Sequence, residues 1–154
     1  MSEIPKLTLV EIIKKIKSKE LSAFEATTAY VNRIKKSKKL NTFITETLDQ
    51  AIASAKNIDD NNLKTGVLAG APIAVKDLFC TKGVQTTASS KILKDFIPPY
   101  ESTVTSKLWD SGAILLGKLN CDEFAMGSSN ETSAYGNVIN PYQKNNENLV
   151  PGGY

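Results

Sequence analysis

The sequence predicts an α/β protein in which N-terminal helices precede the opening part of a mixed, mainly parallel sheet. Residues 1–60 carry mostly amphipathic helical patterns, whereas residues 66–154 begin with apolar, glycine-punctuated segments. Strands are expected around residues 73–75 and over residues 113–118, with a helical pattern between them. Strand, helix and strand in that order favour a crossover between parallel strands. We therefore expect one domain over residues 1–154, with an incomplete sheet core.

Two helices are expected in the first 40 residues. The apolar stripe of the first consists of Leu9, Ile12, Ile13 and Ile16. The corresponding face of the second consists of Phe24, Tyr30, Val31 and Ile34. Thr8 with Glu11, and Ser22 with Glu25, have the spacing of a capping box, in which each residue satisfies a free N–H group of the other.

The following elements are shorter. Residues 41–45 favour a strand, and residues 48–58 a third helix, for which Thr47 and Gln50 form a weaker capping box. The Asn-rich stretch after Ile58 is interpreted as a surface loop. The last helix is expected within residues 102–112, and Gly112 suits the position after its end. Its inward side chains are predicted to be Val104, Leu108 and Trp109.

Composition excludes several classes of function. The chain has no histidine, which rules out Ser-His-Asp and Cys-His catalysis within it and most zinc sites. A net charge of +3 and one arginine give little support to nucleic-acid binding. Cys80 and Cys121 form no CxxC motif, and reduced thiols in a cytoplasmic protein are favoured over a disulfide. No apolar run is long enough to span a membrane, and we expect no metal site.

Lys76 follows the apolar segment APIAV and therefore stands near the carboxyl end of a buried strand. Open α/β sheets place ligands and catalytic groups at such ends. Apolar surroundings disfavour the charged form of an amine, and a neutral lysine can act as a general base where histidine is absent. In the alternative, Lys76 reaches solvent or pairs with Asp77. A lone lysine after a strand does not decide between these interpretations.

Three stretches in a fixed order resemble the amidase signature family. They are GVLAGAPIAVKDLFCTKGVQTTASSKIL at residues 66–93, residues 100–142, and VPGG at residues 150–153. Within the second, GKLNCDEFAMGSSNETSAYG is most similar to the family branch formed by the glutamine-hydrolysing A subunits of tRNA-dependent amidotransferases. The resemblance is looser in the N-terminal helices. It covers about the first third of a typical family member.

The resemblance implies an amide-hydrolysing enzyme with a Ser–cis-Ser–Lys triad. Lys76 stands at the position of the lysine that takes the proton of the nucleophilic serine through the bridging serine. The residues implied to lie beside the bound amide are Met126, Gly127, Ser128 and Ser129. In the alternative, the hydroxyls of Ser128, Ser129 and Thr132 only cap a turn or short helix. Asp122 and Glu123 are interpreted as a helix start rather than as paired catalytic carboxylates.

Both serines of that triad lie beyond VPGG in the family, and Tyr154 stands where the bridging serine is expected. These 154 residues are therefore expected to be inactive by themselves. The resemblance implies no cofactor in this chain. It implies two partners, the B and C subunits of the amidotransferase, of which B uses ATP and Mg²⁺ to amidate a mischarged tRNA with ammonia from glutamine. A fragment of a general amidase, or a shortened paralogue that binds the partner subunits, are the alternatives.

Overall fold

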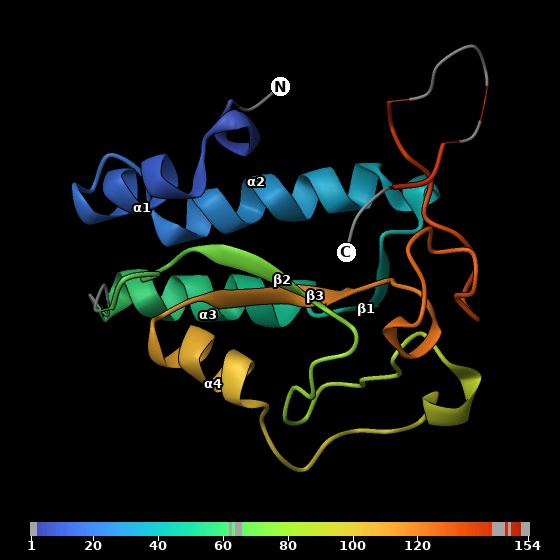
Figure 1. Ribbon diagram of the computed structural model, residues 1–154. Helices are drawn as coiled ribbons and strands as arrows, with labels where there is room; N and C mark the ends of the chain where they lie inside the picture. Colours follow the sequence, from blue (N-terminus) through green and yellow to red (C-terminus); the bar gives the residue numbers. More distant parts are fainter. Residues whose placement is uncertain (1–2, 62, 64–65, 143–146, 148, 152–154) are drawn as a thin grey trace. The chain divides into compact units, whose positions relative to one another are not determined.

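The computed structural model describes residues 3–61, 63, 66–142, 147 and 149–151 (Figure 1). The prediction for Tyr154, and part of the VPGG segment, lies outside the described residues. The α-helices are α1 (Leu9–Lys17), α2 (Ala23–Lys36), α3 (Leu48–Asp60) and α4 (Thr103–Asp110). The strands are β1 (Phe43–Glu46), β2 (Pro72–Lys76) and β3 (Ile114–Leu119). Short 3-10 helices are η1 (Ile4–Lys6), η2 (Lys38–Leu40), η3 (Lys91–Leu93) and η4 (Glu123–Ala125).

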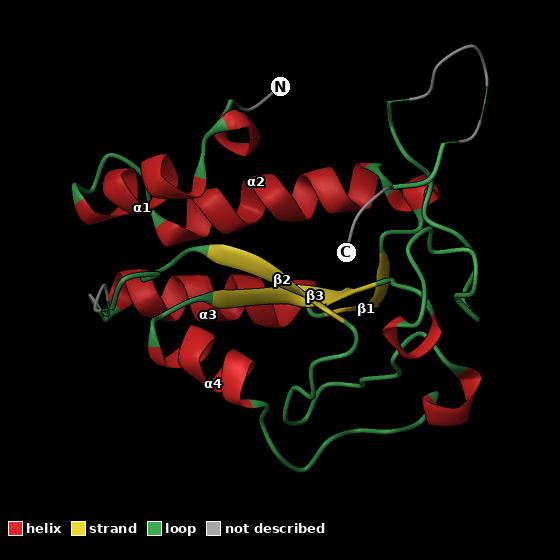
Figure 2. Ribbon diagram, in the orientation of Figure 1, coloured by secondary structure: helices red, strands yellow, loops and turns green. Residues whose placement is uncertain are grey.

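The three strands form one mixed sheet in the order β1-β3-β2, which confirms the predicted fold class (Figure 2). β1 runs antiparallel to β3. β2 and β3 run in the same direction, because the Ala71 carbonyl accepts from the Ile114 N–H at one end and the Asp77 N–H donates to the Leu119 carbonyl at the other. The helix between them, α4, completes the predicted crossover.

Gly117 explains how β1 approaches β3. It has a φ of +150°, and a Cβ atom there would lie 2.4 Å from the Thr45 carbonyl oxygen. Any side chain would therefore collide with the neighbouring backbone. The register of the two strands also shifts between Phe43 and Thr45. The glycine of the GKLN segment is thus required by strand packing.

Two of the three predicted capping boxes form at the helix starts. Glu11 N donates to Thr8 Oγ1 at 3.2 Å and Thr8 N donates to Glu11 Oε2 at 2.7 Å, so the first capping box is confirmed. The second is confirmed by the equivalent bonds between Ser22 and Glu25. The third is wrong, because the Thr47 hydroxyl donates to the Leu115 carbonyl at 2.9 Å and forms no cap.

Some predicted core positions and boundaries are also wrong. Val104 and Leu9 are nearly half exposed, and Thr105 is the buried residue of α4. The hydroxyl of Thr105 donates to the Cys80 carbonyl at 3.1 Å, so a polar contact holds the inner face of this short helix. Helix α3 continues two residues beyond Ile58, into the expected loop. The Asp59 carboxylate there accepts from the N–H groups of Ala23 and Phe24, which begin α2.

The described residues group into two compact units, and the strands β2 and β3 each contribute residues to both. The first contains α1, α2, α3 and α4 from Ser106, and α2 packs against α3 (Figure 1). Its apolar cluster consists of Ile12, Ile16, Leu21 and Ala26, with Ile4, Leu7 and Tyr30 beside it. The second contains residues 37–46, 75–105 and 117–154 and consists largely of loops (Figure 2). Every described helix is too short or too polar to cross a membrane.

Candidate active site

Lys76 is the last residue of β2, as the sequence predicts, and its side chain is half-buried. A turn follows it at once, in which Phe79 N donates to the Lys76 carbonyl at 3.1 Å. The lysine therefore stands where strand and turn meet, at the carboxyl end of a strand in an α/β sheet. This position fits a general base, and the catalytic role itself stays a prediction.

Asp77 turns inward directly after the lysine and is fully buried. Its Oδ2 atom accepts from the Thr87 N–H at 2.9 Å and from the Thr87 hydroxyl at 2.5 Å. Its main-chain carbonyl accepts from the Ala88 N–H at 2.9 Å. The residue therefore joins the end of β2 to the segment 86–90, whose five residues, TTASS, are all buried. A buried carboxylate needs such donors, because unpaired burial of a charge is costly.

Lys118 supplies the countercharge and is the functional candidate that sequence reasoning missed. Its side chain is fully buried, and its Nζ atom lies 3.6 Å from Asp77 Oδ1. The same amine donates to the Phe79 carbonyl at 2.7 Å and to the Thr86 hydroxyl at 2.6 Å. Desolvation lowers the pKa of Lys118, and the nearby Asp77 carboxylate acts in the opposite direction. Two hydrogen bonds and one ion pair thus compensate its burial.

Cys121 follows β3 and faces Ser89 of the buried TTASS segment. Its N–H donates to Ser89 Oγ at 3.0 Å, and its sulfur lies 3.3 Å from the same oxygen. Desolvation raises the pKa of the thiol, although the charge of Lys76 acts to lower it. A protonated, buried thiol is a poor nucleophile. Cys80 is half-buried, both cysteines are free, and their interpretation as packing residues suits this environment best.

Asp122 organises the loop that follows, a role the sequence interpretation missed. As predicted, Asp122 and Glu123 stand at a helix start, since Asp122 directly precedes η4 and Glu123 begins it, but the Asp122 side chain makes no cap there. Its carboxylate accepts from the N–H of Asn130 at 2.9 Å, and from the N–H and hydroxyl of Thr132 at 3.2 and 2.8 Å. A Cβ atom on Gly127 would lie 2.5 Å from its carboxyl carbon. The glycine therefore lets the loop close over this carboxylate.

These contacts make the stability of the loop depend on pH. Desolvation acts to raise the pKa of Asp122, but the hydrogen bonds from Asn130 and Thr132 lower it below the ordinary value of 3.8. A carboxyl group with a lowered pKa stabilises the fold above its ordinary pKa, and this contribution disappears as the pH falls through the folded value. Asp122→Asn is therefore expected to destabilise the loop at pH 7, and the difference should vanish in acid.

Amide hydrogen exchange of peptides covering residues 120–136, followed from pH 7 downward in wild type and variant, measures this difference. Asp95→Asn is the matched control, since its carboxylate is 87% exposed and pairs with Lys94 at the surface. A difference between Asp122→Asn and wild type that stays constant with pH would contradict the explanation.

The residues implied to lie beside the amide occupy this same loop. Met126 is 74% exposed, and Gly127 and Ser128 are also exposed. Ser129 donates to Glu131 Oε2 at 2.5 Å, while Thr132 is bound to Asp122. The charges of Lys76, Asp77 and Asp122 all act on the Cys121 thiol. Asn120 belongs to the same network, since its Oδ1 atom accepts from the Ser133 hydroxyl at 2.6 Å.

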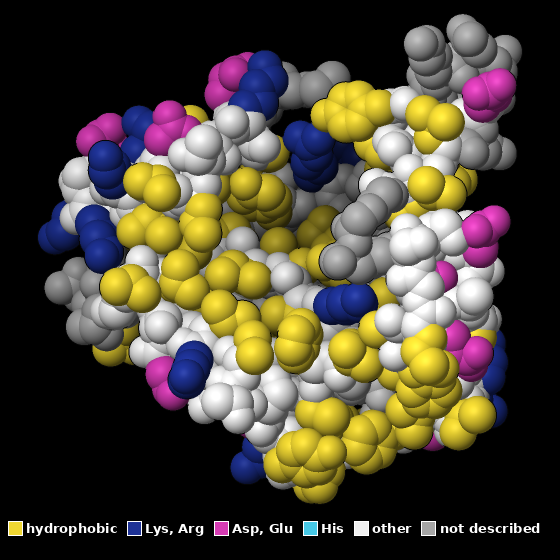
Figure 3. All heavy atoms as spheres, in the orientation of Figure 1, with side chains coloured by type: hydrophobic (Ala, Val, Ile, Leu, Met, Phe, Trp, Pro, Cys, Tyr) yellow, Lys and Arg dark blue, Asp and Glu magenta, His cyan; other side chains and the backbone are white. Residues whose placement is uncertain are grey.

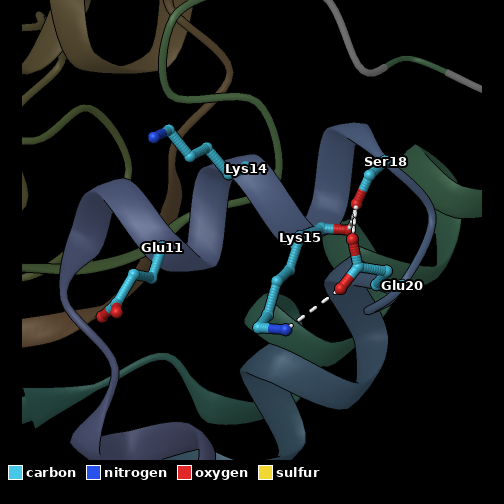
Figure 4. Close-up of a pocket in the computed structure, with 5 residues that line it drawn as sticks. All are labelled: Glu11, Lys14, Lys15, Ser18 and Glu20. Atoms are coloured by element: carbon cyan, nitrogen blue, oxygen red, sulfur yellow. Dashed lines mark hydrogen bonds and ion pairs between the residues drawn. The ribbon is translucent and has the colours of Figure 1, made fainter.

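Two other surfaces carry no catalytic grouping among the residues that the structure describes. A depression along α1 is lined by Glu11, Lys14, Lys15, Ser18 and Glu20, and Figure 4 shows Lys15 and Ser18 both directed at the Glu20 carboxylate. Lys15 and Glu20 form an exposed ion pair, in which the two charges neutralise each other. Apolar side chains also reach the surface, as Figure 3 shows. In the segment 92–100, the exposed large apolar residues are Ile92, Ile97 and Tyr100.

A half-buried lysine thus ends β2, and the next residue in the sequence, Asp77, belongs to a buried ion pair with Lys118. The chain belongs to the Amidase family, whose profile matches residues 25–153. The A subunit of glutamyl-tRNA(Gln) amidotransferase from Pelagibacter ubique is 60% identical over 153 residues, which are 99% of this chain and 31% of the relative. The A subunit from Azorhizobium caulinodans is 51% identical over 157 residues, which are 99% of this chain and 32% of the relative.

The fold of this chain is also similar to solved structures of an amidotransferase A subunit and an amidase. The crystal structure of the glutamyl-tRNA(Gln) amidotransferase A subunit from Thermotoga maritima is 31% identical with a TM-score of 0.71, over 97% of this chain and 30% of that one. A bacterial aryl acylamidase of the amidase signature family is 26% identical with a TM-score of 0.82, over 96% of this chain and 31% of that one. The chain therefore spans about a third of the length of the relatives it matches.

Proposed function

We propose that residues 1–154 form the base-bearing third of a glutamine-hydrolysing amidase domain, in which Lys76 is the general base. The observation that carries the proposal is the position of this lysine at the end of β2, directly before the buried Asp77. The 60% identity to an amidotransferase A subunit favours glutamine as the amide. A lysine can replace histidine as the proton acceptor in a site that disfavours its charged form.

In the proposed reaction, the neutral Lys76 amine accepts a proton from the nucleophilic serine through the bridging serine. The serine oxygen attacks the carboxamide carbon of glutamine, and the lysine returns the proton to the departing nitrogen, which leaves as ammonia. Water then hydrolyses the glutamyl ester. Both serines would come from outside residues 1–154. The loop from Met126 to Ser129 would orient the carboxamide with its N–H and hydroxyl groups.

Within a complete enzyme, the ammonia would serve the amidation of Glu-tRNA(Gln) in the cytoplasm. The B subunit, a partner, would use ATP and Mg²⁺ for that step, together with the C subunit and with tRNA bound through the complex. The support for these partners is the name of the curated relatives, which are subunits of an amidotransferase. The structural similarity to an aryl acylamidase supports a second candidate, a general amidase.

A chimera tests the proposal directly. Residues 1–153 of this chain replace the matching part of the Pelagibacter ubique A subunit, and the product is purified with the other subunits of that enzyme. We expect ammonia release from glutamine at a rate within about tenfold of the parent enzyme, since the two chains are 60% identical over the exchanged part. A folded, assembled chimera that releases none would contradict the proposal, and preferred cleavage of an aryl acylamide would favour the second candidate.

Residues 1–154 expressed alone provide the complementary measurement. They are expected to release no ammonia from glutamine, because the nucleophilic and bridging serines of the proposed reaction lie outside these residues.

A further inference from the structure

We propose that the buried pair of Asp77 and Lys118 is the positioning device of the base, and this proposal rests on the proposed role of Lys76. The pair would fix the turn after Lys76 and set the charge of its surroundings. Neither residue is assigned to the proton transfer itself. Both side chains are fully buried, in a small unit whose other buried side chains are mostly uncharged. The presence of two buried charges there needs an explanation. A buried ion pair gains little stability over apolar residues of the same volume.

The amine of Lys118 holds the turn. Phe79 N donates to the Lys76 carbonyl, and the Phe79 carbonyl accepts from Lys118 Nζ, so the amine binds the far end of the turn that Lys76 begins. Asp77, inside the turn, pairs with the same amine. Asp77 N in turn donates to the Leu119 carbonyl, next to Lys118. Lys76 is therefore flanked by a backbone that is fixed through Lys118.

The carboxylate of Asp77 holds the second half of the site. Ala88 and Ser89 have φ values of +50° and +55°, a conformation that is unfavourable for residues with a side chain. The Asp77 carboxylate accepts from the Thr87 N–H next to this bend, and the Asp77 main-chain carbonyl accepts from the Ala88 N–H. The hydroxyl oxygen of Ser89 in turn accepts a hydrogen bond from the Cys121 N–H. Strained residues of this kind persist only where the surroundings determine them, and they gather at functional sites.

The pair also determines the local charge. The ionisable groups that act on Lys118 are Asp77, Cys80 and Glu101, and those that act on Cys121 are Lys76, Asp77 and Asp122. Asp77 acts on both the Lys118 amine and the Cys121 thiol, and it directly follows Lys76 in the sequence. If only one member of the pair loses its charge, the remaining charge acts on Lys76 uncompensated. Loss of Asp77 disfavours protonation of the base, and loss of Lys118 favours it.

The test uses the chimera with Asp77→Asn, Lys118→Met and the double variant, and measures kcat and KM for glutamine against pH. We expect kcat to fall about 10²-fold in each single variant, with KM little changed, because a small misplacement of a catalytic group has this effect. The acid limb of the kcat/KM profile should move by about one pH unit, downward for Asp77→Asn and upward for Lys118→Met. The double variant should return the limb toward the parent position.

The opposite shifts separate positioning from simple structural support. If the pair only stabilised the fold, the variants would contain less active enzyme but the acid limb of the kcat/KM profile would not move in either one. That result would overturn the proposal. Asp77→Asn keeps the size of the side chain and an acceptor for Thr87, so it remains informative if Lys118→Met fails to fold. Lys94→Met and Asp95→Asn are matched controls from an exposed pair of the same unit, and should change neither kcat nor the limb. An inactive parent chimera would contradict the proposed function instead.

Discussion

Replacement of Lys76 with methionine in the chimera is expected to lower kcat for glutamine hydrolysis by about 10²–10⁴-fold, the usual contribution of a positioned general base. Methionine keeps most of the length and the apolar stem of the side chain but cannot accept a proton. The half-buried position at the end of β2 tolerates this stem. KM should change little, because the base acts on the nucleophile rather than on bound glutamine. Ammonia release at saturating glutamine measures the effect.

Lys82→Met is the control for this substitution. Lys82 lies six residues further along in the same unit and is exposed, so the loss of its charge should leave kcat unchanged. Equal activity of the Lys76 and Lys82 variants would show that the lysine at the strand end is not the base.

The second large effect concerns stability. Lys118→Met is expected to lower the free energy of local opening around residues 72–90 by about 3–5 kcal/mol, since it leaves the Asp77 carboxylate buried without its countercharge. The Phe79 carbonyl and the Thr86 hydroxyl would also lose their donor. Hydrogen exchange of peptides from this region, in the chimera, reports local opening directly.

The double variant, Asp77→Asn with Lys118→Met, should recover a large part of that loss, because no uncompensated charge remains. Lys94→Met, at an exposed ion pair, should change the exchange of the same peptides by less than about 1 kcal/mol. An additive double variant would show that the two side chains do not interact as the structure indicates.

Local patterns predicted the elements that position the candidate site. The apolar segment before Lys76 and the later AILLGK segment fall in neighbouring parallel strands, and both capping boxes at the first two helices formed. Such features depend on residues a few positions apart, so a single sequence contains them. The end of α3 was missed for the opposite reason: the Asp59 carboxylate bonds to the start of α2, at sequence separations of 35 and 36 residues.

Lys118 could have been found and was not. Ile114, Leu116, Lys118 and Asn120 alternate along β3 and the residue after it, and all four are buried. Alternation places a lysine between buried partners on the inner face of a strand, which requires a countercharge. The identity of that partner, Asp77, depends on the pairing of β2 with β3 and is not visible in any local pattern. The role of Asp122 in the loop was missed for a similar reason, since its partners Asn130 and Thr132 come near it only after the loop has folded back.

Chemical replacement of the base tests the central claim most directly. In the chimera, Lys76→Cys removes the amine, and alkylation of the new thiol with bromoethylamine restores an amine on a side chain of nearly the same length but of lower basicity. We predict that Lys76→Cys is inactive, that alkylation restores ammonia release, and that the acid limb of the kcat/KM profile then lies at lower pH than in the alkylated parent chimera. An unalkylated Lys76→Cys enzyme that retains its activity, or a restored activity with an unshifted limb, would contradict the assignment of Lys76 as the base.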